Sequence, residues 1–206
     1  MKLIQGIFIL MFGVFMTIQA KADSPLTSTD FYKAYPNNDY IKLVLQSGDE
    51  MTEEVFQVLE DKSISYDIKA AMINAYGWET KANRAQVYLD FLSQKTKIKN
   101  EKDLIKKGTA EQIMNYSYLY AMENYMDVQP VLLLVDKAIQ KKSTSFALNI
   151  VGGLIMAQNQ MDSDWCGIYK IGQSIREAKQ LKQDMNKEAQ GIIFSYLQLY
   201  QPECNK

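Results

Sequence analysis

Apolar residues recur at helical spacing along nearly the whole chain after residue 27. One face of the segment 63–77, for example, carries Ile64, Ile68, Ala71, Met72 and Ala75. Recurrence every three or four residues is typical of an amphipathic helix, whereas a half-buried strand alternates every second residue. The sequence contains no convincing run of such alternation. The pattern therefore predicts an all-α fold.

Capping residues and glycines divide this pattern into short, closely spaced helices. Thr109 and Gln112 predict a capping box at the start of a long helix that runs to about residue 125. Other helices are expected after Asn38 to near Gly48, after Thr52, from Ser63 or Ser65 to Gly77, and over about 81–95 and 101–107. Three more begin after Asp127, after Ser143 or Ser145, and after Asp162. A last helix ends before Pro202.

The segment 145–158 (SFALNIVGGLIMAQ) is apolar on nearly all sides. A helix of this kind is expected to be the most buried in the protein. Gly152 and Gly153 lie inside it, where glycine costs about 1 kcal/mol relative to alanine. We interpret the pair as a place where another backbone packs closely, and a ligand lying against bare backbone is the alternative.

The first 22 residues have the pattern of a cleavable secretory signal peptide. Lys2 precedes an apolar run over residues 7–18, and Ala20 and Ala22 provide the small residues that signal peptidase needs. An uncleaved membrane anchor is the alternative, but spanning a bilayer takes about 20 apolar residues, and no later stretch is long enough either. We expect cleavage after Ala22, an N-terminal extension with a first short helix over 23–36, and a single all-α domain over 37–206.

Composition excludes several kinds of chemistry. The chain has 23 basic and 24 acidic residues, which argues against nucleic-acid binding because that function needs a concentrated positive surface. It has no histidine, which removes the usual nucleophilic triads and the commonest zinc ligand, and two cysteines cannot form an all-cysteine zinc site. No glycine-rich phosphate loop is present. We therefore predict neither a metal nor a cofactor.

The two cysteines, Cys166 and Cys204, predict a disulfide. An even number of cysteines in an exported chain favours pairing. Cys166 is expected early in the penultimate helix and Cys204 just after the last one, so an antiparallel hairpin would bring them together. The pair lacks the C-x-x-C spacing of a redox-active site.

Residues 66–77 (YDIKAAMINAYG) resemble the second helix of a HEAT-type repeat. In addition, residues 63–68 (SISYDI) and 143–148 (STSFAL) share two serines, an aromatic residue and a closing aliphatic residue. The resemblance implies a curved stack of antiparallel helical hairpins whose concave face binds another macromolecule. A non-repetitive helical bundle is the alternative.

Aromatic residues are the candidates for a binding surface: Trp78, Tyr116, Tyr120 and Trp165. Tyrosine and tryptophan are favoured at recognition surfaces because each provides a rigid apolar area with a polar tip. Most tyrosines of the segment 109–125 are expected to pack in the core, which leaves Tyr116 and Tyr120 as the pair expected to be exposed. Core packing is the alternative for every one of these residues.

Acidic residues offer a second kind of site. A glycosidase needs two carboxylates about 5–10 Å apart across the sugar, and two acidic groups could supply them: Asp49, Glu50, Glu53 and Glu54, or Asp162 and Asp164 beside Trp165. Acidic residues at helix N-termini are also expected on electrostatic grounds alone.

The sequence therefore predicts an exported, non-catalytic interaction protein that binds another protein or a cell-envelope component, in the periplasm or outside the cell. Two alternatives remain open: a carboxylate-dependent, glycan-active enzyme of the envelope, and an inhibitor or immunity-type protein. A purely structural envelope component would differ from all of these by associating with itself.

Overall fold

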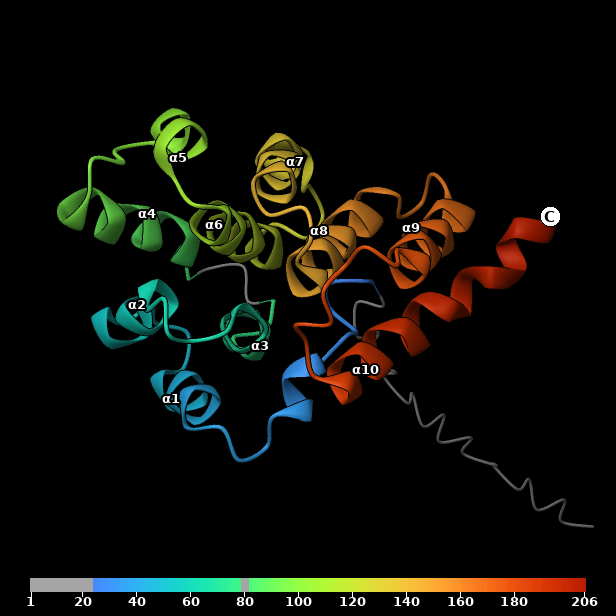
Figure 1. Ribbon diagram of the computed structural model, residues 1–206, viewed down its shortest axis with the longest axis horizontal. Helices are drawn as coiled ribbons and strands as arrows, with labels where there is room; N and C mark the ends of the chain where they lie inside the picture. Colours follow the sequence, from blue (N-terminus) through green and yellow to red (C-terminus); the bar gives the residue numbers. More distant parts are fainter. Residues whose placement is uncertain (1–23, 79–81) are drawn as a thin grey trace, which may run out of the picture.

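The computed structural model describes residues 24–78 and 82–206, and within these ranges the protein is entirely helical (Figure 1). An isolated bridge between Ser145 and Lys182 is the nearest approach to a strand in this part of the chain. The predicted all-α fold is confirmed. The predicted signal peptide, residues 1–22, lies outside the described residues.

The described residues form ten α helices and three 3₁₀ helices. In chain order these are η1 (Phe31–Ala34), α1 (Asp39–Ser47), α2 (Glu53–Glu60), α3 (Tyr66–Ala75), α4 (Arg84–Lys95), α5 (Glu101–Lys107), α6 (Ala110–Glu123), η2 (Gln129–Val131), α7 (Leu132–Lys141), α8 (Phe146–Asn159), α9 (Trp165–Glu177), α10 (Lys187–Leu197) and η3 (Gln198–Asn205).

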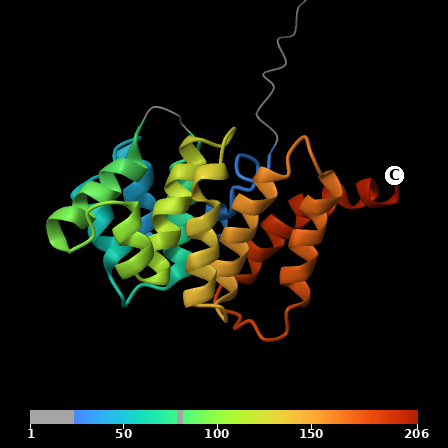
Figure 2. The same cartoon turned by 90° about the horizontal axis from the view of Figure 1, so that it is seen from above.

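The helices pack in layers whose axes run roughly in one direction (Figure 1). One layer contains α4, α6, α8 and α9, and α5 and α7 lie on its outer side; α1, α2, α3 and α10 lie on the other side. Consecutive helices from α6 to α9 are antiparallel neighbours in contact, as Figure 2 shows from above. The connections between helices therefore gather at the two ends of the stack.

Helix α8 lies at the centre, in contact with α3, α6, α7 and α9. It is buried along most of its length, as its apolar sequence predicts. A Cβ atom added at Gly152 would lie 2.9 Å from Ile139 Cδ1 and 3.0 Å from Val135 Cγ1, both on α7. One added at Gly153 would lie 2.5 Å from Ile175 Cδ1 on α9. Close packing therefore explains both glycines. The groups that approach them are side chains, however, and not another backbone as the sequence suggested.

Most helix starts follow from the sequence. Thr109 and Gln112 form the predicted capping box of α6. Helix α4 begins at Arg84, later than expected, because its first backbone N–H groups are capped by a residue far away in the chain. The buried Glu123 carboxylate accepts hydrogen bonds from the backbone N–H groups of Arg84 and Ala85, and from Arg84 Nε at 3.2 Å. The sequence around Arg84 cannot predict this helix start, because the capping residue Glu123 is distant in the chain.

The segment 24–36 is held against the core by Asn74 of α3. Its side chain accepts a hydrogen bond from the Tyr32 amide at 3.0 Å and donates to the Thr29 carbonyl and the Tyr118 hydroxyl, each at 3.1 Å. Phe31 of η1 is fully buried. The first short helix of this segment is therefore part of the same core as α3 and α6.

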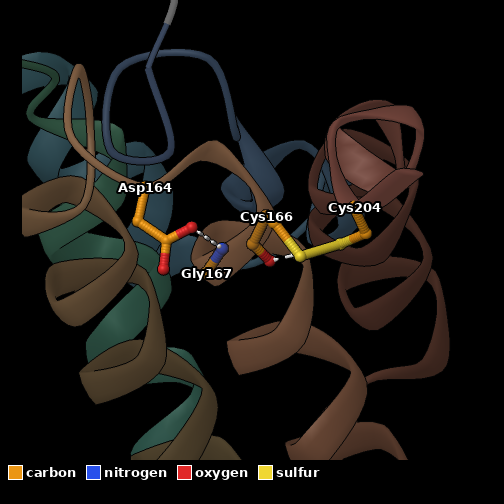
Figure 3. The surroundings of a disulfide bond; sticks show 4 residues. All are labelled: Asp164, Cys166, Gly167 and Cys204. Atoms are coloured by element: carbon orange, nitrogen blue, oxygen red, sulfur yellow. Dashed lines mark hydrogen bonds between the residues drawn. A yellow bond between two sulfur atoms is a disulfide. The ribbon is translucent and has the colours of Figure 1, made fainter. Parts of the chain in front are cut away.

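Cys166 and Cys204 form a disulfide between α9 and η3, as predicted (Figure 3). The two residues are 38 positions apart in the chain. In the described ranges, no helix combines the length and the apolar character that crossing a membrane requires.

We expect the double variant Cys166→Ser/Cys204→Ser to lose about 3–4 kcal/mol of unfolding free energy, because the cross-link restricts the unfolded chain. Urea unfolding of the variant and of the unreduced protein measures this difference. Alkylation of the unreduced protein followed by mass spectrometry is the control, and two reactive thiols there would contradict the bridge.

Candidate functional site

The two tryptophans lie at one end of the helical stack. Trp78 follows the end of α3, and Trp165 begins α9. The connection from α6 to α7 and the connection from α8 to α9 lie at the same end (Figure 2), and η3 contacts α9. We call this surface the aromatic end and define it by the residues Trp78, Tyr125, Met126, Met161, Trp165 and Tyr200.

Three direct contacts and one shared hollow connect these residues into a row. The Trp78 and Tyr125 rings meet edge to face, with their centroids 5.4 Å apart. Tyr125 and Met161 line a common hollow of about 130 Å³. Met161 Sδ accepts a hydrogen bond from the Tyr200 hydroxyl at 3.8 Å, and the Tyr200 ring lies 5.5 Å from that of Trp165. Four segments that are distant in sequence therefore build one surface.

The aromatic end is both exposed and fixed in position. Trp78 is 38% exposed, Trp165 is 40% exposed and Met126 is 82% exposed. Each tryptophan ring packs against a tyrosine ring, and the residue after Trp165, Cys166, is cross-linked to η3 by the disulfide. A large apolar ring held in one orientation loses little conformational entropy when a partner covers it.

The aromatic end is rimmed with negative charge. Asp127 and Asp162 line the hollow, and Asp164 precedes Trp165; all three are exposed. Asp162 has a positive φ of 63°, which turns the chain between α8 and α9. The Asp164 carboxylate accepts a hydrogen bond from the Gly167 amide at 2.8 Å and so caps α9 (Figure 3).

Neither of the two predicted tyrosines is among the residues that form this row. Tyr116 is buried, and its hydroxyl donates a hydrogen bond to Glu101 at 2.5 Å. Burial and the Glu101 carboxylate raise the pKa of Tyr116 well above its ordinary value. Tyr120 is half-buried, and burial likewise raises its pKa. The expected exposure of Tyr116 is wrong because α4 and α5 pack over this flank of α6.

Two of the acidic candidates for glycan chemistry, Glu53 and Asp164, have structural contacts. Glu53 pairs with Lys95 at 2.9 Å, and that contact lowers its pKa. In the described part of the chain, the carboxylates whose pKa departs from the ordinary value are all shifted downward: Glu53, Asp61, Asp103 and Glu111. A glycosidase acid needs a raised pKa. These carboxylates therefore give no support to the glycan-active alternative.

Metal-binding geometry is not found either among the residues that the structure describes: no three acidic or cysteine side chains cluster there. Comparison of the chain with protein-family models, with curated proteins and with solved structures finds no match. The resemblance of residues 66–77 to a HEAT-type repeat thus stays a prediction. Function has to be argued from this chain's own surfaces.

We expect the fluorescence of Trp165 to be quenched more strongly by caesium than by iodide, because Asp162 and Asp164 attract cations to its surroundings. The variant Trp78→Phe leaves Trp165 as the single tryptophan of the chain. Stern–Volmer titrations at low ionic strength, scaled to free tryptophan amide, measure the preference. Adding Asp162→Asn should reduce it; stronger quenching by iodide would contradict the acidic surroundings.

Proposed function

We propose that this chain is an exported, non-catalytic interaction protein that binds another protein or a cell-envelope component through its aromatic end. The observation that carries the proposal is the convergence of Trp78, Met126 and Trp165 from three separate segments on one exposed surface. Tryptophan, tyrosine and methionine are enriched in the cores of protein interfaces.

The size of the hollow favours a macromolecule over a small ligand. Pockets for small molecules usually enclose about 300–1,000 Å³. The hollow between Tyr125 and Met161 has about 130 Å³, which suits one inserted side chain. The exposed faces of the two tryptophans extend this contact to both sides.

Charge favours a protein over a lipid surface. Asp127, Asp162 and Asp164 would repel the anionic headgroups that attract basic proteins to membranes. A partner with lysine or arginine around an apolar centre would complement the acidic rim, and arginine also stacks on tryptophan faces. We therefore favour a partner protein with a basic surface.

Export to the periplasm or the medium is supported by two features. Residues 1–22 have the signal-peptide pattern, and Cys166 pairs with Cys204, as is common in oxidising compartments. The proposed partner is therefore sought in the cell envelope.

The test is capture from envelope extract with the immobilised protein, followed by titration calorimetry with the partner recovered. We expect Trp78→Ala/Trp165→Ala to weaken binding about 30-fold or more, because exposed aromatic residues at an interface centre contribute at least about 2 kcal/mol. Met126→Glu provides an independent disruption, since Met126 is 82% exposed and its loss leaves the core intact.

The matched control is Tyr40→Ala/Leu45→Ala, which removes an exposed aromatic and an exposed aliphatic residue from α1. Binding by this control should equal that of the unaltered protein. Full binding by both aromatic-end variants, or an equal loss in the α1 control, would contradict the proposal. Inhibition of a captured envelope enzyme would identify the partner as a target of an inhibitor or immunity-type protein.

A further inference from the structure

A second surface lies at the opposite end of the stack. Helix α6 ends beside the aromatic end, where Tyr125 follows it, and begins at Ala110 after its cap Thr109 (Figures 1 and 2). The start of α6 lines a cleft together with residues of α2, α3 and α7. The cleft has a volume of about 340 Å³, and a hollow of about 290 Å³ adjoins it through Lys62, Glu111 and Lys142. We call it the basic cleft.

Four lysines and two carboxylates line the basic cleft: Lys62, Lys69, Lys141, Lys142, Glu60 and Glu111. The residues come from four helices and an adjoining loop: the end of α2 and the loop that follows it, α3, the start of α6, and the end of α7. Positive charge therefore exceeds negative charge in a concave site, where low-dielectric walls strengthen the field on a bound ion.

Glu111 organises two of these lysines. Its carboxylate accepts from Lys69 Nζ at 2.9 Å and from Lys142 Nζ at 2.6 Å. Burial raises the pKa of Glu111, but the hydrogen bonds and charges of Lys142 and Lys69 outweigh burial and leave it below the ordinary value. Lys69 is only 1% exposed, so its charge is held in the wall of the cleft, while Glu111 and Lys142 remain partly open to solvent.

The other two lysines are available to a ligand. Lys62 and Lys141 form no ion pair within residues 24–78 and 82–206, and both are exposed at the cleft. A lysine at the end of α7 is expected on electrostatic grounds alone, because it faces the negative end of that helix. Attraction to the helix end therefore explains the position of Lys141. It explains neither the position of Lys62 before α3 nor the burial of Lys69.

Neutral donors also converge on the site. In the first turn of a helix the amides lack intrahelical acceptors, and the capping box of α6 occupies those of Thr109 and Gln112. Ala110 and Glu111 follow Thr109 at the cleft wall. Tyr66 lines the adjoining hollow and is 4% exposed; its buried hydroxyl has no hydrogen-bond partner among the described residues, and burial, with a smaller contribution from the Glu111 charge, raises its pKa.

We propose that the basic cleft binds a tetrahedral oxyanion, the phosphate or sulfate group of a small ligand, between Lys62 and Lys141. Two unpaired ammonium groups are compact point charges that can each meet a separate oxygen of a tetrahedral anion, and together they attract an anion with close to two charges more strongly than a singly charged carboxylate. No arginine lines the cleft. Its volume, together with that of the adjoining hollow, accommodates a phosphate with a small substituent. This site is independent of the aromatic end.

The experiment is a calorimetric titration of the purified protein at constant ionic strength with inorganic phosphate, sulfate, glycerol 3-phosphate and acetate. We expect phosphate and sulfate to bind and acetate to bind at least about tenfold more weakly. The variant Lys62→Gln/Lys141→Gln should weaken phosphate binding about tenfold or more, because it removes two charge-assisted hydrogen bonds. Stronger binding of glycerol 3-phosphate would assign the site to a phosphate ester, and weaker binding to the free anion.

The matched control Lys170→Gln/Lys187→Gln removes two exposed lysines from α9 and α10 and should keep full phosphate affinity. Urea unfolding verifies that both double variants stay folded; the four substituted lysines are all exposed. Absence of phosphate binding, equal binding of acetate, or unchanged affinity in Lys62→Gln/Lys141→Gln would overturn the proposal.

Discussion

The close packing around α8 is the constraint on which the rest of the structure depends. This helix contacts helices on both sides and in the other layer, and two adjacent glycines let it do so. Gly152 admits side chains of α7, and Gly153 admits side chains of α9. Any larger residue at these positions would push a neighbour outward, because a close-packed interior has no spare volume. The spacing of α6, α7 and α9 therefore follows from a few atoms of α8.

The packing around α8 also fixes the positions of the helices that carry the two proposed surfaces. The aromatic end is assembled from connections that leave α3, α6 and α8, and the basic cleft from the opposite ends of α3, α6 and α7. Contacts with buried residues hold one group at each surface: the exposed Trp165 ring packs against the buried Tyr200, and Glu111 pairs with the buried Lys69. A rigid core thus holds an apolar, acid-rimmed surface and a basic one apart.

The sequence predicts the elements better than the surfaces. Helical periodicity, the Thr109 capping box and the pairing of Cys166 with Cys204 are local or nearly local signals, and the structure confirms them. The sequence does not predict which other helices pack against a given helix. Tyr116 is buried although its position on the helix flank predicts exposure, because the helical pattern does not show that α4 and α5 cover that flank. Tyr125 and Met161 could not be assigned to a site from sequence, since only the fold brings them together.

The central claim, that close approach at α8 sets the arrangement of the other helices, is tested most directly by denaturant unfolding of Gly152→Ala beside Gly191→Ala. An added Cβ at Gly191 on α10 would have no neighbour within 4 Å, so that variant should gain up to about 1 kcal/mol from helix propensity. At Gly152 the rigid Val135 side chain and Ile139 oppose the methyl group, and we expect a net loss of about 1–3 kcal/mol. A Gly152→Ala protein as stable as the unaltered one would contradict the claim.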